Sequence, residues 1–181
     1  MNDEAELDAA RHKWLLEAAR LGDLGVVRAV LKANPLLAKR ADSRNGFTIL
    51  HRAAQGGHKE IVDFVLSNVP SLAKEHDQHH CTALHWAAQT GHGGIVKLLL
   101  RKHPELAKEK DENGNTALHT AALHGQHEVV SLLLRECPDL AHEEDDRQRT
   151  ADAYAGEQVA RLIQKTRIRE TAARRAGPRG R

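Results

Sequence analysis

The feature that most constrains this chain is a short stretch that returns at a fixed spacing. Residues 82–91 read Thr-Ala-Leu-His-Trp-Ala-Ala-Gln-Thr-Gly, and closely similar stretches start at Thr48 and at Thr116, 34 residues before and 34 residues after Thr82. A repeat with a period in the thirties is typical of a solenoid, in which each unit packs against its neighbours along the chain. The sequence therefore predicts an elongated array of similar units rather than one globular core.

Each full unit is predicted to consist of two short helices around a glycine turn. A threonine begins the first helix, where its hydroxyl group can cap a free backbone N–H group, which stabilises a helix by about 1 kcal/mol. Glycine ends that helix six residues after the histidine, and aliphatic residues then follow at helical spacing. A Pro-x-Leu-Ala sequence ends the second helix, because proline cannot continue a helix. The motif positions are Thr48, Leu50, His51 and Gly57; Thr82, Leu84, His85 and Gly91; and Thr116, Leu118, His119 and Gly125.

The periodicity places three full units between two atypical ends. Residues 15–31 resemble a unit without its threonine and histidine, so we expect a capping unit there with Trp14 in its core. After Thr150 the spacing shortens, which predicts a single capping helix over about 151–169. The expected segments are a disordered 1–4, an N-terminal cap 5–38, full units 39–73, 74–107 and 108–141, a truncated C-terminal cap 142–169, and a disordered basic tail 170–181.

Composition and charge narrow the class of protein. Hydrophobic residues make up 40% of the chain and aromatic residues only 3%, so the core must be aliphatic. Residues 161–181 carry eight basic side chains and one acid, whereas residues 1–160 carry 19 basic and 24 acidic side chains. No apolar run reaches the roughly 18 residues of a membrane span, and the acidic N-terminus lacks the apolar region of a secretory signal. The two cysteines, Cys81 and Cys137, do not make a disulfide framework, so we expect a cytoplasmic or nuclear protein.

The repeated unit resembles that of the ankyrin-repeat family. One unit matches the family pattern at Asp111, Gly114, Thr116, Leu118, His119, Ala121, Ala122 and Gly125. There are departures: Ile49, Ala83 and Ala117 stand where the family has proline, His80 replaces a loop glycine, and Pro-x-Leu-Ala replaces the usual ending of the unit. The resemblance implies an all-α solenoid of helix-turn-helix units, whose connecting loops project as β-hairpin fingers beside a concave helix face.

The resemblance also implies where a partner binds, because relatives bind proteins through the finger loops and the concave face. In the first finger the corresponding residues are Asp42, Arg44, Asn45 and Phe47. In the second they are His76, Gln78, His79 and Cys81, and in the third Lys110, Glu112, Asn113 and Asn115. The helix face would present Arg52, Gln55, Trp86, Gln89, Thr90, Thr120, Leu123 and His124.

Trp86 is the sharpest single candidate among these residues. Its equivalents in the neighbouring units are Arg52 and Thr120, so the repeat does not require an indole at this position. Tryptophan often anchors an interface, where it contributes about 2 kcal/mol or more. An equally weighted alternative is that Trp86 only packs across Arg52 and Thr120 of the adjacent units.

Catalytic, metal and cofactor sites are not expected. The densest potential ligand cluster is His76, His79, His80, Cys81 and His85, but His85 belongs to the repeat motif and the spacing does not suit four converging zinc ligands. No serine or cysteine is placed with a histidine and an acid as a nucleophile would require. We therefore expect no catalytic residue, no metal and no cofactor.

The sequence thus predicts a monomeric, non-catalytic module that binds another protein, as an adaptor or an inhibitor. Two alternatives remain open. The arginine-rich C-terminal tail could carry the activity of a nuclear or nucleic-acid-associated regulator, although it has no aromatic residue to stack on bases. The regular repeat is also compatible with an engineered scaffold.

Overall fold

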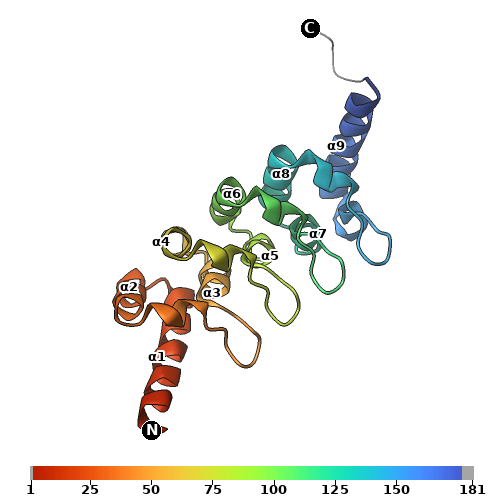
Figure 1. Ribbon diagram of the computed structural model, residues 1–181. Coiled ribbons are helices and arrows are strands. Elements are labelled where there is room, and N and C mark those ends of the chain that lie inside the picture. Colours follow the sequence, from red (N-terminus) through yellow and green to blue (C-terminus); the bar gives the residue numbers. More distant parts are fainter. Residues whose placement is uncertain (1, 177–181) are drawn as a thin grey trace.

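A computed structural model describes residues 2–176, with side chains from residue 7 onward; Met1 and residues 177–181 lie outside the described part. The chain forms pairs of antiparallel helices stacked into an elongated array (Figure 1). Within the described part there is no strand, so the prediction of an all-α solenoid is confirmed. The first helices of the pairs are α1 (Asn2–Leu21), α3 (Ile49–Gly56), α5 (Ala83–Gln89) and α7 (Ala117–Leu123). The second helices are α2 (Leu24–Ala33), α4 (Lys59–Asn68), α6 (Gly93–Lys102) and α8 (His127–Glu136), and α9 (Glu157–Ala176) closes the array.

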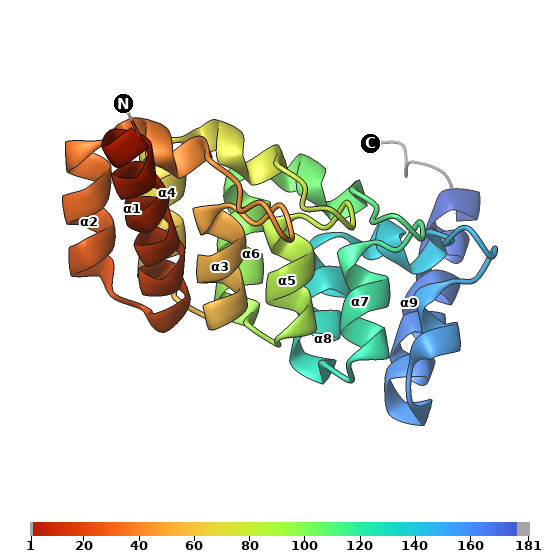
Figure 2. The same ribbon diagram turned by 90° about the horizontal axis from the view of Figure 1, so that it is seen from below.

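The helices form two layers beside a row of loops. Figure 1 shows the second helices in one row, the shorter first helices in the next, and the loops projecting beyond them on the far side. The longer helices α1 and α9 stand at the two ends of the array, as the turned view in Figure 2 also shows. Each loop lies between the second helix of one unit and the first helix of the next, so the projecting row brings together residues that are far apart in the sequence.

Aliphatic and small side chains fill the space between the layers. Leu50, Leu84 and Leu118 of the motif are fully buried. The paired alanines at 53–54, 87–88 and 121–122 are also buried and let neighbouring first helices approach closely. Burial of such side chains is the main favourable term in folding, and here each unit supplies only part of the surface that covers its neighbour.

The Pro-x-Leu-Ala sequences form short 3₁₀ helices rather than plain connectors. These are η1 (Pro35–Lys39), η2 (Pro70–Lys74), η3 (Pro104–Lys108) and η4 (Pro138–His142). Proline occupies the start of each one, where its missing N–H group leaves no bond unmade. The leucine and alanine of each sequence are buried, so this ending extends the core of every unit.

The N-terminal cap differs from the prediction in two respects. Helix α1 begins at Asn2, so residues 2–4 are helical rather than disordered. Trp14 is 71% exposed and does not belong to the core of the cap, where Leu15 and Ala19 are fully buried instead. The reason is helical phase, since Leu15 and Ala19 lie one turn apart on the inner face while Trp14 is turned away from it.

The C-terminal cap also differs from the predicted single helix over 151–169. The 3₁₀ helix η5 (Ala151–Tyr154) replaces the first helix, and α9 starts at Glu157 and continues to Ala176. The shorter spacing therefore reflects a shortened first helix, and residues 170–176 are helical rather than disordered. Val159 and Ile163 pack into the core, while Arg174 is hydrogen-bonded to Asp139. The rest of the tail that was expected to be disordered, 177–181, lies outside the described residues.

Buried histidines join each unit to the next. In the second unit, Nδ1 of His85 accepts a hydrogen bond from the backbone N–H of Thr82 at 3.2 Å, and Nε2 lies 3.1 Å from the carbonyl oxygen of Asn115 in the next loop. Because a carbonyl oxygen can only accept, the bonding pattern assigns the proton to Nε2 of a neutral imidazole. The same arrangement recurs at His51 with Cys81 and at His119 with Arg149.

The N-terminal cap has its own version of this bond, which was not predicted from the sequence. Leu16 occupies the position of the motif histidine, but His12 lies one helical turn earlier on α1. Its Nε2 atom is 2.9 Å from the carbonyl oxygen of Arg40 at the start of the first loop. Burial lowers the pKa of His12, which favours the neutral ring.

A second set of bonds runs in the opposite direction along the array. Nε2 of His92 lies 3.3 Å from the carbonyl oxygen of Gln55 in the preceding unit, and the His92 ring packs over Gly57. Gly57 has a φ of 81°, and an added Cβ would lie 2.6 Å from that ring. Glycine is therefore required here by both the backbone conformation and the contact.

The buried histidines make stability sensitive to pH in a defined direction. Burial lowers the pKa of His51 to about 4, whereas the unfolded side chain titrates near 6.5. Between pH 7 and pH 5 the unfolded chain therefore binds more protons than the folded chain, so the free energy of unfolding should fall with pH. The limit for His51 alone is about 3 kcal/mol once the pH reaches 4. Urea unfolding at pH 7 and pH 5 measures this loss.

His51→Gln provides the control for this prediction. The variant should be less stable at pH 7 by about 1–3 kcal/mol, because bonds to Thr48 and Cys81 are weakened or lost. It should lose less stability than the wild type between pH 7 and pH 5. An equal loss in both proteins would show that His51 does not stay neutral in the fold.

Candidate partner-binding face

The loops and first helices form one continuous surface along the array. We call it the finger–helix face and define it by the four loops 40–47, 75–81, 109–115 and 143–149 together with the outward side chains of α3, α5 and α7. Figure 2 shows these loops following one another along the layer of first helices. The order of the units in the sequence is thus the order of the fingers on the surface.

An aspartate near the start of each finger shapes its backbone. In the second finger, Oδ1 of Asp77 accepts hydrogen bonds from the backbone N–H groups of His79 at 2.8 Å and Cys81 at 2.9 Å. Such a side chain replaces the strand pairing that would otherwise hold a tight loop. Asp42, Asp111 and Asp145 accept equivalent bonds in the other fingers.

The fingers are hydrogen-bonded loops rather than regular β-hairpins. Each is closed by a backbone bond across its base, such as the 3.0 Å bond from Asp77 N–H to the carbonyl oxygen of Cys81. The only β-bridge in the described part of the chain joins Glu144 and Thr150. The expected hairpin strands are therefore absent from residues 2–176, because aspartate side chains take up N–H groups that a strand partner would bind.

Backbone bonds also run from one fingertip to the next. The N–H group of Gln78 donates to the carbonyl oxygen of Asn45, and that of Glu112 donates to His79, both at 3.0 Å. A third bond joins Asp146 to Asn113 at 3.1 Å. The tips are thus held in register, which reduces the conformational entropy that a partner must remove on binding.

Two fingers hold a residue other than glycine in the left-handed conformation. His80 has a φ of 57° where the third finger has Gly114 with a φ of 77°. Gln148 adopts the same conformation in the fourth finger, with a φ of 58°. This conformation is unfavourable for residues with a side chain, and such positions gather at functional sites.

Trp86 is attached to its own finger rather than projecting freely. Its Nε1–H group donates to Oδ2 of Asp77 at 2.8 Å, and its ring packs against that of Phe47 in a T-shaped arrangement with 4.9 Å between centroids. The side chain is half-buried. In the first unit Arg52 takes the equivalent place, with its guanidinium group 3.2 Å from Asp42. The contacts of Trp86 described here are thus with Asp77 and Phe47 rather than with Arg52 and Thr120, and a role in binding stays a prediction.

Phe47 was expected to contact a partner, but it is only 4% exposed. Its ring lies beneath the guanidinium group of Arg52, at 4.2 Å from the centroid, and beside Trp86. The expectation of an accessible Phe47 was therefore wrong. An aromatic ring at the base of a loop is worth more buried against two side chains than exposed to water.

The other predicted contact residues lie on the finger–helix face, at two levels of exposure. Those at the fingertips and at the ends of the helices are exposed: Arg44, Asn45, Gln78, His79, Glu112, Asn113, Thr90, Leu123 and His124. The rest are half-buried: Arg52, Gln55, Cys81, Trp86, Gln89, Asn115 and Thr120. Leu123 is 58% exposed and is the large apolar side chain of this face that water reaches most freely.

Histidine and glutamate side chains cross-link the second and third fingers. His79 Nδ1 lies 2.8 Å from the carboxylate of Glu112, and this bond raises the pKa of His79. His76 and Glu109 form a second pair at 3.3 Å.

Burial raises the pKa of the Cys81 thiol to about 12, so this cysteine stays protonated and is a poor nucleophile.

The histidine-rich second finger does not form a metal site in the structure. No group of three or more histidine, cysteine, aspartate and glutamate side chains within residues 7–176 is placed to hold a metal ion. The bonds of His85 to Thr82 and Asn115 already occupy both of its ring nitrogens.

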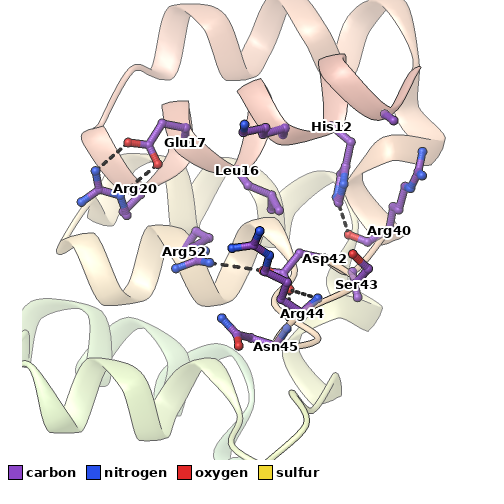
Figure 3. Close-up of a pocket in the computed structure, with 13 residues that line it drawn as sticks. His12, Leu16, Glu17, Arg20, Arg40, Asp42, Ser43, Arg44, Asn45 and Arg52 are labelled. Carbon is purple, nitrogen blue, oxygen red and sulfur yellow. Dashed lines mark hydrogen bonds and ion pairs between the residues drawn. The ribbon is translucent and has the colours of Figure 1, made fainter. Parts of the chain in front are cut away.

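A groove at the N-terminal end of the finger–helix face was not predicted from the sequence. A cavity of about 590 Å³ lies between α1, the first finger and α3 (Figure 3). Its lining includes the side chains of Lys13, Arg40, Arg44 and Arg52. One sequence signal points to it, namely the extra residue in the loop between Ala38 and Thr48, which lengthens the first finger.

Comparison with known proteins agrees with this geometry. The family model described as ankyrin repeats in three copies matches residues 15–110 and 69–148. The chain belongs to the ankyrin-repeat family. The two overlapping matches include the three full units and parts of both caps.

Two curated proteins of rice, Oryza sativa subsp. japonica, resemble parts of this ankyrin-repeat protein. The probable E3 ubiquitin-protein ligase XBOS31 is 42% identical over 52 residues, which are 29% of this chain and 12% of that protein. The E3 ubiquitin-protein ligase XB3 is 38% identical over 63 residues, or 34% of this chain and 14% of that protein. The matched segments thus span only about an eighth of either relative.

None of the helices described here combines the length and the apolar character needed to cross a membrane.

The different surroundings of the two tryptophans give a direct test of the site geometry. Trp14→Phe leaves the half-buried Trp86, and Trp86→Phe leaves the exposed Trp14. Acrylamide should quench the fluorescence of the first variant less, and its emission should lie at shorter wavelength. Asp77→Ala in the Trp14→Phe background should increase quenching and destabilise the array by about 1–3 kcal/mol, because two backbone N–H groups and the indole N–H lose their acceptor. Equal quenching of the two single variants would contradict the placement of Trp86.

Proposed function

We propose that this ankyrin-repeat chain is a non-catalytic module that binds a folded protein through its finger–helix face. One observation carries the proposal: the face displays exposed, varied side chains on fingers that are already bonded to one another and to the helices. Gln78 and Glu112 have exposed side chains, and their backbone N–H groups donate hydrogen bonds to the preceding fingertip. A partner therefore meets an ordered surface, and little of the binding free energy is spent on ordering it.

The residues that build the repeat differ from those available to a partner. Thr82, His85 and their equivalents are buried and use their polar groups within the array. The exposed positions beside them differ from unit to unit, as Arg44, Gln78 and Glu112 illustrate. A surface whose frame is constant and whose exposed side chains vary suits recognition of one particular partner.

The relatives support an interaction role and no more than that. They are named as E3 ubiquitin-protein ligases, but the matches cover only 52 and 63 residues of this chain and leave most of each relative unmatched. We propose no ligase activity for this chain. An adaptor that brings a partner to another protein and an inhibitor that covers a partner's surface both fit the face. Since both cysteines are free thiols, we keep the cytoplasm or the nucleus as the expected compartment.

The structure gives less support to a function carried by the basic C-terminal segment. Within the described residues, Arg167 bonds Thr150 and Asp152, and Arg174 bonds Asp139. These two basic side chains serve the attachment of α9 to the last unit. The finger–helix face is therefore the better candidate.

Affinity capture with a matched pair of variants tests the proposal. Gln78→Arg with Leu123→Asp alters two exposed positions of the finger–helix face without changing net charge. Glu128→Gln with Ser131→Asp also leaves the net charge unchanged, but it alters α8, which lies in the layer of second helices; we call this the outer layer. Proteins retained by the wild type should bind the first variant at least about tenfold more weakly, a loss of about 1.4 kcal/mol.

The control should bind the same proteins as tightly as the wild type does. Both variants should keep the wild-type melting temperature, because the four replaced side chains are exposed. Loss of the captured protein from the outer-layer variant, with full binding by the face variant, would contradict the proposal. So would a wild type that retains no protein specifically.

A further inference from the structure

Charge is distributed unevenly along the row of fingers. The first finger, 40–47, contains two basic side chains and one acid. The later fingers have the opposite balance: acids exceed lysines and arginines by two in each of 75–81, 109–115 and 143–149. The finger–helix face therefore has a basic N-terminal end and an acidic C-terminal end, which orients any charged partner along it.

The basic end coincides with the groove between α1, the first finger and α3. Of the described side chains that line it, five are cationic and two, Glu17 and Asp42, are acidic. Figure 3 shows Arg20 turned back to Glu17 and Arg52 turned to Asp42. The N–O distances are 2.6 Å and 3.2 Å, so both acids are already neutralised by partners within the groove.

Three cations are left over: Lys13, Arg40 and Arg44. Each is exposed, and none forms an ion pair or side-chain hydrogen bond with any side chain that the structure describes. Lys13 comes from α1, whereas the two arginines come from the finger opposite, so the excess positive charge lies on both walls of the groove. Like charges that face each other across a cleft attract an anion into it.

The backbone that carries these cations is fixed in place. His12 is hydrogen-bonded to the carbonyl oxygen of Arg40, which ties the start of the finger to α1. Oδ1 of Asp42 accepts bonds from the N–H groups of Arg44 at 3.1 Å and Asn45 at 2.6 Å. A ligand therefore has to order only the arginine and lysine side chains, not the loop.

The lining also distinguishes among anionic ligands. Small and aliphatic side chains, Ala9, Leu16 and Ala41, also line the groove, and they offer an apolar surface to the backbone and small side chains of a peptide. Among the described residues that line the groove there is no phenylalanine, tyrosine or tryptophan, and the rings of His12 and the nearby Phe47 are buried, so unpaired bases would find no exposed ring on which to stack. The size, about 590 Å³, lies within the roughly 300–1,000 Å³ range of ligand pockets.

We propose that this groove binds an acidic, extended segment of a protein partner, with carboxylates paired to Lys13, Arg40 and Arg44. The inference rests on the proposed function, because it assigns a chemical class to the partner at one end of the same face. Arginine is well suited to this role, since its planar guanidinium group binds a carboxylate through two parallel hydrogen bonds.

The test uses the full chain and peptides of known composition. A fluorescein-labelled octapeptide of alternating glutamate and alanine is titrated by fluorescence anisotropy at 50 mM and 300 mM NaCl, beside its glutamine–alanine counterpart and an eight-nucleotide oligothymidine. We expect the wild type to bind the acidic peptide more tightly than the other two, and more weakly at the higher salt concentration.

Matched variants locate the binding. Arg40→Glu with Arg44→Glu should weaken binding of the acidic peptide by at least about tenfold at 50 mM NaCl, because two favourable charge contacts become repulsive. Lys97→Glu with Arg101→Glu changes the net charge equally on α6 of the outer layer and should alter the affinity by less than about twofold. Lys13→Glu tests the opposite wall and remains informative if the double arginine variant fails to fold, which circular dichroism reveals.

Three results would overturn the inference: no binding of the acidic peptide by the wild type, an equal loss in the α6 control, or tighter binding of oligothymidine. In each case the groove would not be a site for acidic peptides. The proposed function fails separately, if the wild type captures no protein or if the outer-layer variant alone loses its partner. If the Arg40→Glu, Arg44→Glu variant binds a captured partner as tightly as the wild type does, the groove is not the binding site for that partner. The finger–helix face then remains the proposed binding surface.

Discussion

The structure depends on a buried, neutral histidine that holds two units together. Its Nδ1 atom accepts from the threonine that starts its own helix, and its Nε2 atom donates to a carbonyl oxygen of the next finger, as His85 does to Asn115. A protonated ring could not accept the first bond and would carry an unpaired charge in the core. Helix start, finger position and contact between units are therefore coupled through one side chain that repeats three times.

This coupling explains how a chain with few aromatic residues presents an ordered surface. Aspartates such as Asp77 shape the fingers, backbone bonds join the tips, and the histidines fix the fingers to the helices. Trp86 belongs to this framework as much as to the surface, because Asp77 holds its indole N–H group. The contact surface that is left for a partner consists of the exposed tips, the ends of the first helices and the basic groove beside α1.

The repeat carried enough information to predict the fold and the frame of the site, because the same residues recur at the same spacing and solve the same packing problem. Residues that occur once were harder to interpret. The phase of α1 turns Trp14 to solvent, and the base of the first finger buries Phe47. The extra residue in the first finger was the only sequence signal of the groove, since Lys13 lies on α1 and Arg40 and Arg44 lie in the finger, two segments that only folding brings together. The helical end of α9 depends on bonds to the last unit, such as that of Arg174 with Asp139.

We propose that a protein partner binds the finger–helix face, and this proposal can be tested on the whole surface at once. The most direct measurement is hydrogen–deuterium exchange of the full chain with and without a captured partner, followed by mass spectrometry. We predict slower exchange of fingertip amides in 43–46, 78–80 and 112–114 and no change in α4, α6 and α8. Slower exchange only in these outer helices or in α9, with unchanged exchange at the fingertips, would contradict binding at the finger–helix face.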